Sequence, residues 1–137
     1  MLKYKNIVYK NRGLTVDAIV LKGKKVLLIK RKHDPCKGAW ALPGGFIEWH
    51  ESAEEALNRE VFEETNLQVV TSYLVGAYTN PKRDPRETMS LCFFVTTKGE
   101  VRVGDDAEDY MFYALSDLPG MAFDHKKMIE DFLLTQK

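Results

Sequence analysis

Residues 44–67 of the chain read Gly-Gly-Phe-Ile-Glu-Trp-His-Glu-Ser-Ala-Glu-Glu-Ala-Leu-Asn-Arg-Glu-Val-Phe-Glu-Glu-Thr-Asn-Leu. Ser52 followed by Glu55 forms a capping box, so a helix is predicted to begin there. The helix can continue to about Thr65, because Asn66 readily adopts the left-handed backbone that ends helices. The two glycines that open the stretch predict a turn, where backbone can approach a ligand closely.

One side of this predicted helix is both apolar and acidic. At 100° per residue, a core-facing stripe is formed by Ala53, Ala56, Leu57 and Val61. Three carboxylates continue the same side, namely Glu60, Glu63 and Glu64. Like charges one turn apart repel, and unpaired charge near a core is costly. A hard, oxygen-seeking cation such as Mg²⁺ would remove that cost. The alternative from the residues alone is a solvated acidic helix with ion pairs on Arg59.

The spacing of the stretch resembles the sequence box of the Nudix hydrolases. That box has a glycine, five residues, a glutamate, seven residues, and then Arg-Glu-aliphatic-x-Glu-Glu-x-x-aliphatic. The matching positions here are Gly45, Glu51, Arg59, Glu60, Val61, Glu63, Glu64 and Leu67. The chain departs at Asn66, where the family has Gly, although Asn tolerates the same backbone. Trp49 and His50 also replace residues that are often Pro and Gly in relatives.

The resemblance implies a role for each residue of the box. A diphosphate repels an incoming nucleophile, so metal ions must neutralise its oxygens. The implied ligands of Mg²⁺, or alternatively Mn²⁺, are the Gly45 carbonyl, Glu60, Glu63 and Glu64. Glu63 is also the candidate catalytic base, Arg59 orients the glutamates, and Glu51 is the partner of Arg59. Glu48, in the same turn, is either a further acidic group of the site or a loop carboxylate that faces water, and the sequence leaves both open.

A second segment bears on the substrate. Residues 78–86 read Tyr-Thr-Asn-Pro-Lys-Arg-Asp-Pro-Arg and lie between two predicted strands. The prolines stiffen this loop, and Arg83 and Arg86 suit phosphate or ribose oxygens. Physical reasoning alone leaves an ordinary solvated loop equally open. The loop resembles the ADP-ribose pyrophosphatase branch of the family, as do residues 104–107 and 122–125.

That resemblance implies cleavage of ADP-ribose into AMP and ribose 5-phosphate. Two alternatives are a house-cleaning nucleoside triphosphate pyrophosphohydrolase and a Nudix domain that senses ADP-ribose without cutting it. The intact box favours catalysis. Trp49 and Phe46 flank the glutamates and are candidates to stack on adenine, with packing in a core or interface equally open. His125 is predicted to start the last helix, with an approach to the ligand as the alternative. His33 and His50 have no neighbouring Cys or His at ligand spacing, so no zinc site is predicted.

Composition sets broader limits on the chain. Its 137 residues suit one domain, 1–137, and its 20 basic residues balance 20 acidic ones. The balanced charge predicts neither nucleic acid nor an anionic membrane as partner, and the family resemblance implies a small-molecule nucleoside diphosphate. A homodimer is left open. Without a long apolar run or a cleavable leader, the chain is predicted to be cytoplasmic. Cys36 and Cys92 are expected to be free thiols.

The remaining pattern predicts a mixed α/β fold. An extended arm is expected over residues 1–12, and Met128, Ile129, Phe132 and Leu133 lie on one side of a helix predicted for 124–134. Strands are predicted for 14–21, 25–31, 40–42, 68–78, 88–96 and 109–115, and a turn at 98–99 leads into 100–103. Strands on both sides of a central helix, with a second helix at the end, favour a mixed sheet between helices. This agrees with the α/β/α sandwich of the Nudix fold.

Overall fold

The central strand of the fold is β3 (Leu14–Lys22), which is covered on both faces. The computed structural model describes residues 2–105 and 107–136. In the sheet, β3 pairs with β8 (Met89–Lys98) in parallel and with β4 (Lys25–Arg31) in antiparallel. The edge strand β7 (Gln68–Tyr78) pairs with β8, while β9 (Ala107–Ala114) and β5 (Trp40–Ala41) pair with β4.

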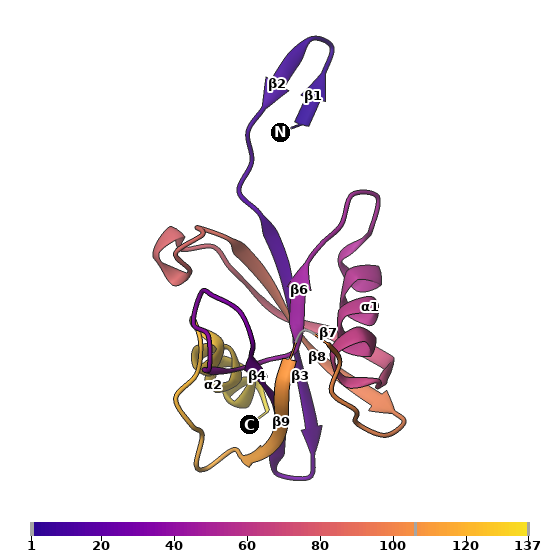
Figure 1. Cartoon of the computed structure of the whole chain (residues 1–137), viewed down its shortest axis with the longest axis vertical. Helices are drawn as coiled ribbons and strands as arrows, with labels where there is room; N and C mark the ends of the chain where they lie inside the picture. The colour runs from indigo at the N-terminus through magenta and orange to yellow at the C-terminus, as the bar shows by residue number, and fades with distance from the viewer. Residues whose placement is uncertain (1, 106, 137) are drawn as a thin grey trace.

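Two helices cover the two faces of this sheet. Helix α1 (Ala53–Thr65) packs on one face, and α2 (His125–Thr135) packs on the other (Figure 1). Alternate residues of β3 supply both cores, because successive strand side chains point to opposite faces. Thus Val16, Ala18 and Val20 pack in the core under α1, and Ile19 packs in the core under α2. The predicted α/β/α sandwich with a mixed sheet is confirmed.

The ends of α1 follow the local sequence signals. Ser52 Oγ accepts the Glu55 N–H at 3.1 Å, and the Glu55 carboxylate accepts the Ser52 N–H at 3.0 Å. Asn66 ends the helix with φ of 66°, in the left-handed region. Residues 100–104, which form no strand, run beside the last turn, where Arg102 N–H donates to the Thr65 carbonyl at 2.8 Å. The predicted capping box and left-handed end are confirmed.

Two segments differ from the sequence prediction. The Gly44–Phe46 segment is strand β6, paired antiparallel with β3, and not a turn. The predicted arm folds back as a hairpin of β1 (Leu2–Tyr4) and β2 (Ile7–Tyr9), and Figure 1 shows it projecting from the body. The reason is the positive φ of Lys5 and Asn6, 48° and 65°, which suits a tight hairpin turn. Residue 1 of the predicted arm lies outside the described residues.

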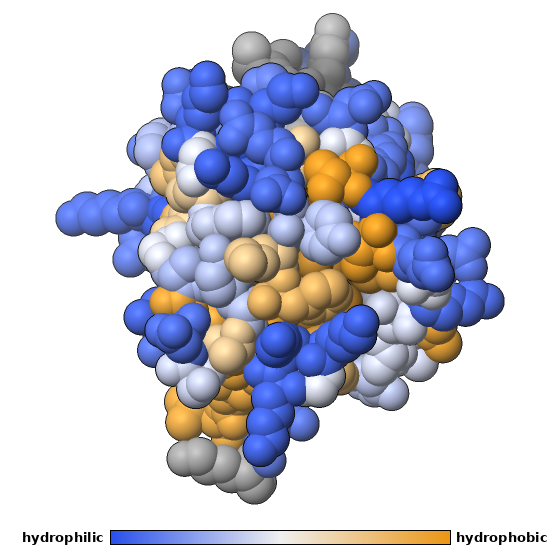
Figure 2. Space-filling view, turned by 60° about the horizontal axis from the view of Figure 1, so that its bottom comes forward, coloured by the Kyte–Doolittle hydropathy of each residue, from blue (hydrophilic) through white to orange (hydrophobic). Residues whose placement is uncertain are grey.

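The surface and the cysteines complete the description. Both thiols are free, as predicted, and Cys36 is exposed while Cys92 is buried, which raises the pKa of the Cys92 thiol. Apolar residues lie in the middle of the face seen in Figure 2, bordered by hydrophilic ones. Within residues 2–105 and 107–136, none of the helices has the length and apolar character needed to cross a bilayer.

Candidate active site

Arg59 on α1 is the centre of a cluster of glutamates. Its Nε and Nη2 donate to the two carboxylate oxygens of Glu51 at 2.7 and 2.9 Å. Its Nη1 donates to Glu60 at 2.8 Å and to Glu63 at 3.2 Å, and lies 3.7 Å from Glu48. The structure thus places the predicted partners Arg59 and Glu51 in contact. The bonds from Arg59 lower the pKa of Glu51 to about 2, and those of Glu51 raise the pKa of Arg59.

The two glycines of β6 receive the other side of this cluster. A Cβ built on Gly45 would lie 2.5 Å from the Glu60 carboxyl carbon, so glycine alone leaves room for that carboxylate. Gly44 donates its N–H to Glu64 Oε2 at 3.1 Å. Glycine is needed here because protein groups approach the backbone closely, and not because the chain turns.

The donor set of this cluster fits a hard divalent cation. Four carboxylates share one guanidinium, which leaves the cluster an excess of negative charge. The side-chain atoms that could bind a metal here are all carboxylate oxygens, the ligands that such a cation prefers. Glu60 lies in the space that a Cβ at position 45 would fill. Among the described residues, no three acidic, His or Cys side chains already converge as a metal cage. Binding of an ion would therefore require the glutamates to exchange bonds with Arg59 or Gly44 for bonds to the metal.

Glu64, which follows Glu63 of the cluster in α1, borders a small cavity of about 90 Å³. Its walls come from β6, the end of β4, the 83–86 loop and the start of α2. Three guanidiniums surround the ring of Phe123, with their carbons 5.0, 5.5 and 6.0 Å from its centroid for Arg31, Arg86 and Arg83 respectively. Ligand sites usually measure about 300 Å³ or more, so a nucleotide can enter only if side chains that fill this space move.

The predicted substrate-binding residues have different surroundings. Phe46, Arg83 and Arg86 line the cavity, and Trp49 does not. Trp49 is 69% exposed, and its ring contacts the neighbouring His50 edge-on. The stacking role of Trp49 stays a prediction that this arrangement does not support. The structure brings the other three side chains together beside the glutamate cluster.

Arg83 and Arg86 already have acidic partners. The Arg83 side chain is only 3% exposed, and it donates to both carboxylate oxygens of Asp124 at 2.8–3.0 Å. Arg86 is half-exposed and bonds Asp84 at 2.8 Å. Burial raises the pKa of Asp84, but the bonds from Arg86 and Thr88 outweigh this effect and lower it to about 2. Both arginines therefore have structural partners within the protein.

A buried polar network beneath the cavity was missed by the sequence reasoning. His125, which begins α2 as predicted, accepts the Leu42 N–H on Nδ1 at 3.0 Å, and its Nε2 lies 3.4 Å from Asp17 Oδ1. Ser90 donates its hydroxyl to Asp17. Burial raises the pKa of Asp17, while His125 and Ser90 lower it, with a net lowering. Because Ser90 bonds Asp17 and not His125, these residues do not form an activated-serine arrangement. The sequence signal for this network was Asp17, an acidic residue within an apolar predicted strand.

Comparison with known proteins gives consistent results. Residues 11–132 match the NUDIX domain family model. The chain is 46% identical over 128 residues to an ADP-ribose pyrophosphatase of Methanocaldococcus jannaschii, covering 92% of the chain and 76% of that protein.

Two solved structures carry bound ligands. The NUDIX domain of Shewanella oneidensis NrtR, complexed with ADP ribose, matches with a TM-score of 0.84 at 29% identity, covering 94% of the chain and 91% of that domain. A bifunctional NMN adenylyltransferase/ADP ribose pyrophosphatase of Francisella tularensis, complexed with AMP and a Mn ion, matches with a TM-score of 0.79 at 30% identity. That match covers 93% of the chain but only 42% of the larger protein.

Proposed function

The chain belongs to the Nudix family of pyrophosphohydrolases, and we propose that it hydrolyses the diphosphate of ADP-ribose to AMP and ribose 5-phosphate with Mg²⁺ as its metal. The observation that carries this proposal is the position of one cavity between two kinds of group. Glu64 and the glycines of β6 form one wall, and arginine and phenylalanine side chains form another. The 46% identity to an ADP-ribose pyrophosphatase supports the choice of substrate.

Each end of this site suits one part of such a substrate. A metal held by Glu60, Glu63, Glu64 and the Gly45 carbonyl would supply positive charge that neutralises the diphosphate oxygens. The guanidiniums at the other wall suit phosphate oxygens, because they donate charge-assisted hydrogen bonds. Phe46 offers an aromatic face beside them, and the guanidinium carbon of Arg86 lies 5.1 Å from the centroid of its ring.

The residues of the chain have separate tasks in the proposed reaction. Arg59 holds Glu51, Glu60 and Glu63 in one orientation through the bonds described above. Glu63, whose side chain is half-exposed, is the proposed base that accepts a proton from the attacking water. The water oxygen bonds one phosphorus, the bridging P–O bond breaks, and the bridging oxygen leaves with the other phosphate. The products are therefore two monophosphates.

The test is hydrolysis of a panel of substrates by the purified chain. ADP-ribose, other nucleoside diphosphate compounds and nucleoside triphosphates would be incubated with Mg²⁺, with Mn²⁺ and with chelator, and products identified by NMR. We expect AMP and ribose 5-phosphate, the highest kcat/KM for ADP-ribose, and no turnover in chelator. Preferred cleavage of triphosphates would refute the substrate, and tight ADP-ribose binding without cleavage would indicate a sensor.

A pair of variants tests the proposed metal ligand Glu64. Glu64→Gln keeps the size of the side chain and removes its charge, so turnover should fall at least about 100-fold. Glu54→Gln on the first turn of the same helix is the matched control, because Glu54 is exposed. Full activity of Glu64→Gln at saturating Mg²⁺ would show that this carboxylate does not serve the metal.

A further inference from the structure

The three arginines of the cavity differ in how their charge is used. Arg83 is buried, and its guanidinium donates hydrogen bonds to Asp124 and Thr88. Arg86 is bound to Asp84, whose own carboxylate is almost fully buried. A phosphate that approached either arginine would compete with a carboxylate already in place. Neither is therefore a free source of positive charge.

Arg31, at the end of β4, is the exception. Its Nε donates to the Pro35 carbonyl at 2.7 Å, and its guanidinium lies 5.0 Å from the Phe123 ring centroid. Across residues 2–105 and 107–136, it makes no ion pair with a carboxylate, and its two terminal nitrogens donate to no protein acceptor. These nitrogens belong to a side chain that lines the cavity together with Glu64. Sequence reasoning did not single out Arg31.

The loop after β4 holds this side chain in position. Arg31 donates its N–H to the Ala39 carbonyl at 2.9 Å, and its own carbonyl accepts the Gly38 N–H at 2.8 Å. These bonds close the loop at its base and fix the Pro35 carbonyl that receives Nε. A side chain that is already fixed loses less conformational entropy when it binds a ligand.

The electrostatic surroundings favour an anion next to Arg31. Burial lowers the pKa of Arg31, and the nearby charge of Arg86 lowers it further. The acidic groups within range, Glu64 and Asp84 among them, offset this only in part. An anion in the cavity would relieve both effects, because it compensates the lost hydration and the like-charge repulsion.

We propose that Arg31 is the phosphate-binding arginine of the cavity, and that its two terminal nitrogens donate hydrogen bonds to non-bridging oxygens of the substrate's diphosphate. The inference rests on the proposed function only in requiring a diphosphate substrate, and it does not depend on the group beyond the second phosphate. Arg83 and Arg86 then hold the walls of the cavity in place through their ion pairs, and Arg31 binds the ligand.

The experiment measures binding without turnover. The probe is α,β-methylene-ADP, in which carbon replaces the bridging oxygen so that the bond cannot be hydrolysed, titrated calorimetrically in Mg²⁺. Arg31→Gln should raise its Kd by about 10–100-fold, the effect expected for lost hydrogen bonds between charged groups. Arg31→Lys keeps the charge but not the fork, so it should recover part of this loss.

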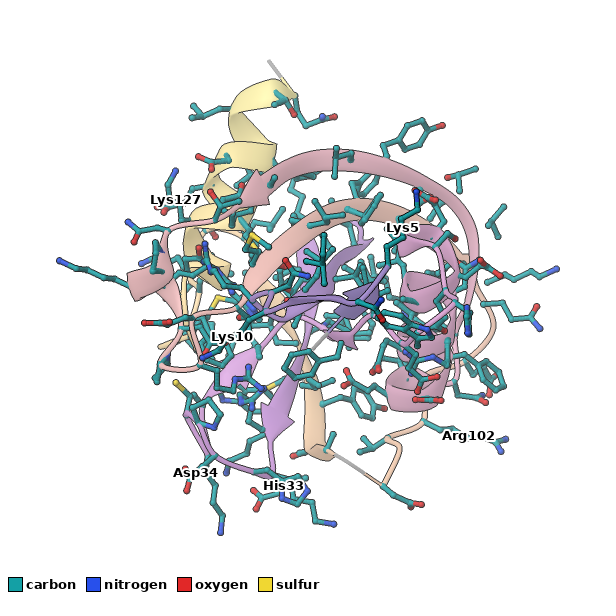
Figure 3. All side chains as sticks on the ribbon, turned by 90° about the horizontal axis from the view of Figure 1, so that it is seen from above. Lys5, Lys10, His33, Asp34, Arg102 and Lys127 are labelled. Atoms are coloured by element: carbon teal, nitrogen blue, oxygen red, sulfur yellow. The ribbon has the colours of Figure 1, made fainter. Side chains whose placement is uncertain are left out.

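Arg102→Gln is the matched control. Figure 3 shows Arg102 projecting beside α1, away from His33 and Asp34 of the loop that holds Arg31. Its Kd should equal that of the wild type, and melting temperatures report on folding. An unchanged Kd for Arg31→Gln would overturn the proposal, as would equal losses for the Gln and Lys variants, which would indicate a merely structural role.

If Arg31→Gln does not fold, Arg31→Lys decides alone, with a Kd increase of about fivefold expected and wild-type affinity contradicting the proposal. The outcome is separate from that of the substrate panel. A chain that prefers triphosphates over ADP-ribose would refute the proposed substrate, while the effect of Arg31 on α,β-methylene-ADP would still be read directly.

Discussion

Gly44 and Gly45 are neighbours in β6, yet the structure predicts different results when each is replaced by alanine. A Cβ at position 44 would lie 2.0 Å from the Val16 carbonyl oxygen and 2.9 Å from Asp17 Cα. Both are backbone atoms of the central strand, so they can move only if the pairing of β6 with β3 is disturbed. The three atoms nearest a Cβ at position 45 would instead all belong to the carboxylate of Glu60, at 2.5–2.6 Å, and that side chain can rotate away.

These contacts give the expected sizes of the two effects. Overpacking against fixed atoms costs about 1–3 kcal/mol, so Gly44→Ala should lower the melting temperature by about 3–12 °C. Gly45→Ala should change stability by less than about 1 kcal/mol, because the smaller entropy of the unfolded alanine chain offsets part of the strain. It should still lower kcat/KM at least about 100-fold, since Glu60 is displaced from the proposed metal position.

Thermal unfolding and ADP-ribose hydrolysis, measured on both variants and the wild type, provide the check. Calorimetric titration with Mn²⁺ would show whether Gly45→Ala also weakens metal binding, as expected if Glu60 is a ligand. The reasoning fails if Gly45→Ala melts as low as Gly44→Ala. It also fails if Gly45→Ala retains wild-type turnover, because Glu60 would then not need the space above residue 45.

Three further variants test separate parts of the structure. Asn66→Val should be less stable than Asn66→Gly by about 1 kcal/mol or more, because a β-branched residue resists the left-handed backbone; equal melting temperatures would contradict this. Arg83→Ala should lose about 3–5 kcal/mol of stability by leaving Asp124 without its buried partner, and a stable variant with selectively weaker substrate binding would show instead that Arg83 serves the ligand. The pKa of Glu51, lowered to about 2 by Arg59, makes its contribution to stability complete above pH about 4.5 and lost as pH falls through about 2. Glu51→Gln should therefore flatten the decline of melting temperature over that range, and parallel curves for variant and wild type would count against the pair.

Features set by residues close in the sequence were predictable. The capping box at Ser52 and the left-handed end at Asn66 depend on contacts within one helical turn, and both were confirmed. The Val, Ile and Leu residues of the β3 segment likewise predicted a strand. The glycines of β6 were noticed, but the atoms that require them belong to Val16 and Glu60, which only the folded sheet brings near.

The roles of the arginines could not be assigned from the sequence. Arg83 lies in a basic, proline-containing loop, and nothing in that loop reveals a carboxylate partner 41 residues away in Asp124. Arg31 is the last residue of a predicted strand, and among residues 2–105 and 107–136 it forms no ion pair with a carboxylate. The partners of Arg83 and Arg31 depend on long-range packing, whereas the pairs of Arg59 lie within the box and were predictable from its spacing.

The buried network connects the start of α2 to the glutamates of α1. His125 accepts the Leu42 N–H on Nδ1, and its Nε2 faces Asp17. Asp17 in turn lies against Gly44, where a Cβ would come within 2.6 Å of its carboxylate oxygen. Gly44 donates its N–H to Glu64. Because each contact is buried or partly buried, we expect a shift of α2 at its first residue to displace the glutamate that borders the cavity, through β3 and β6.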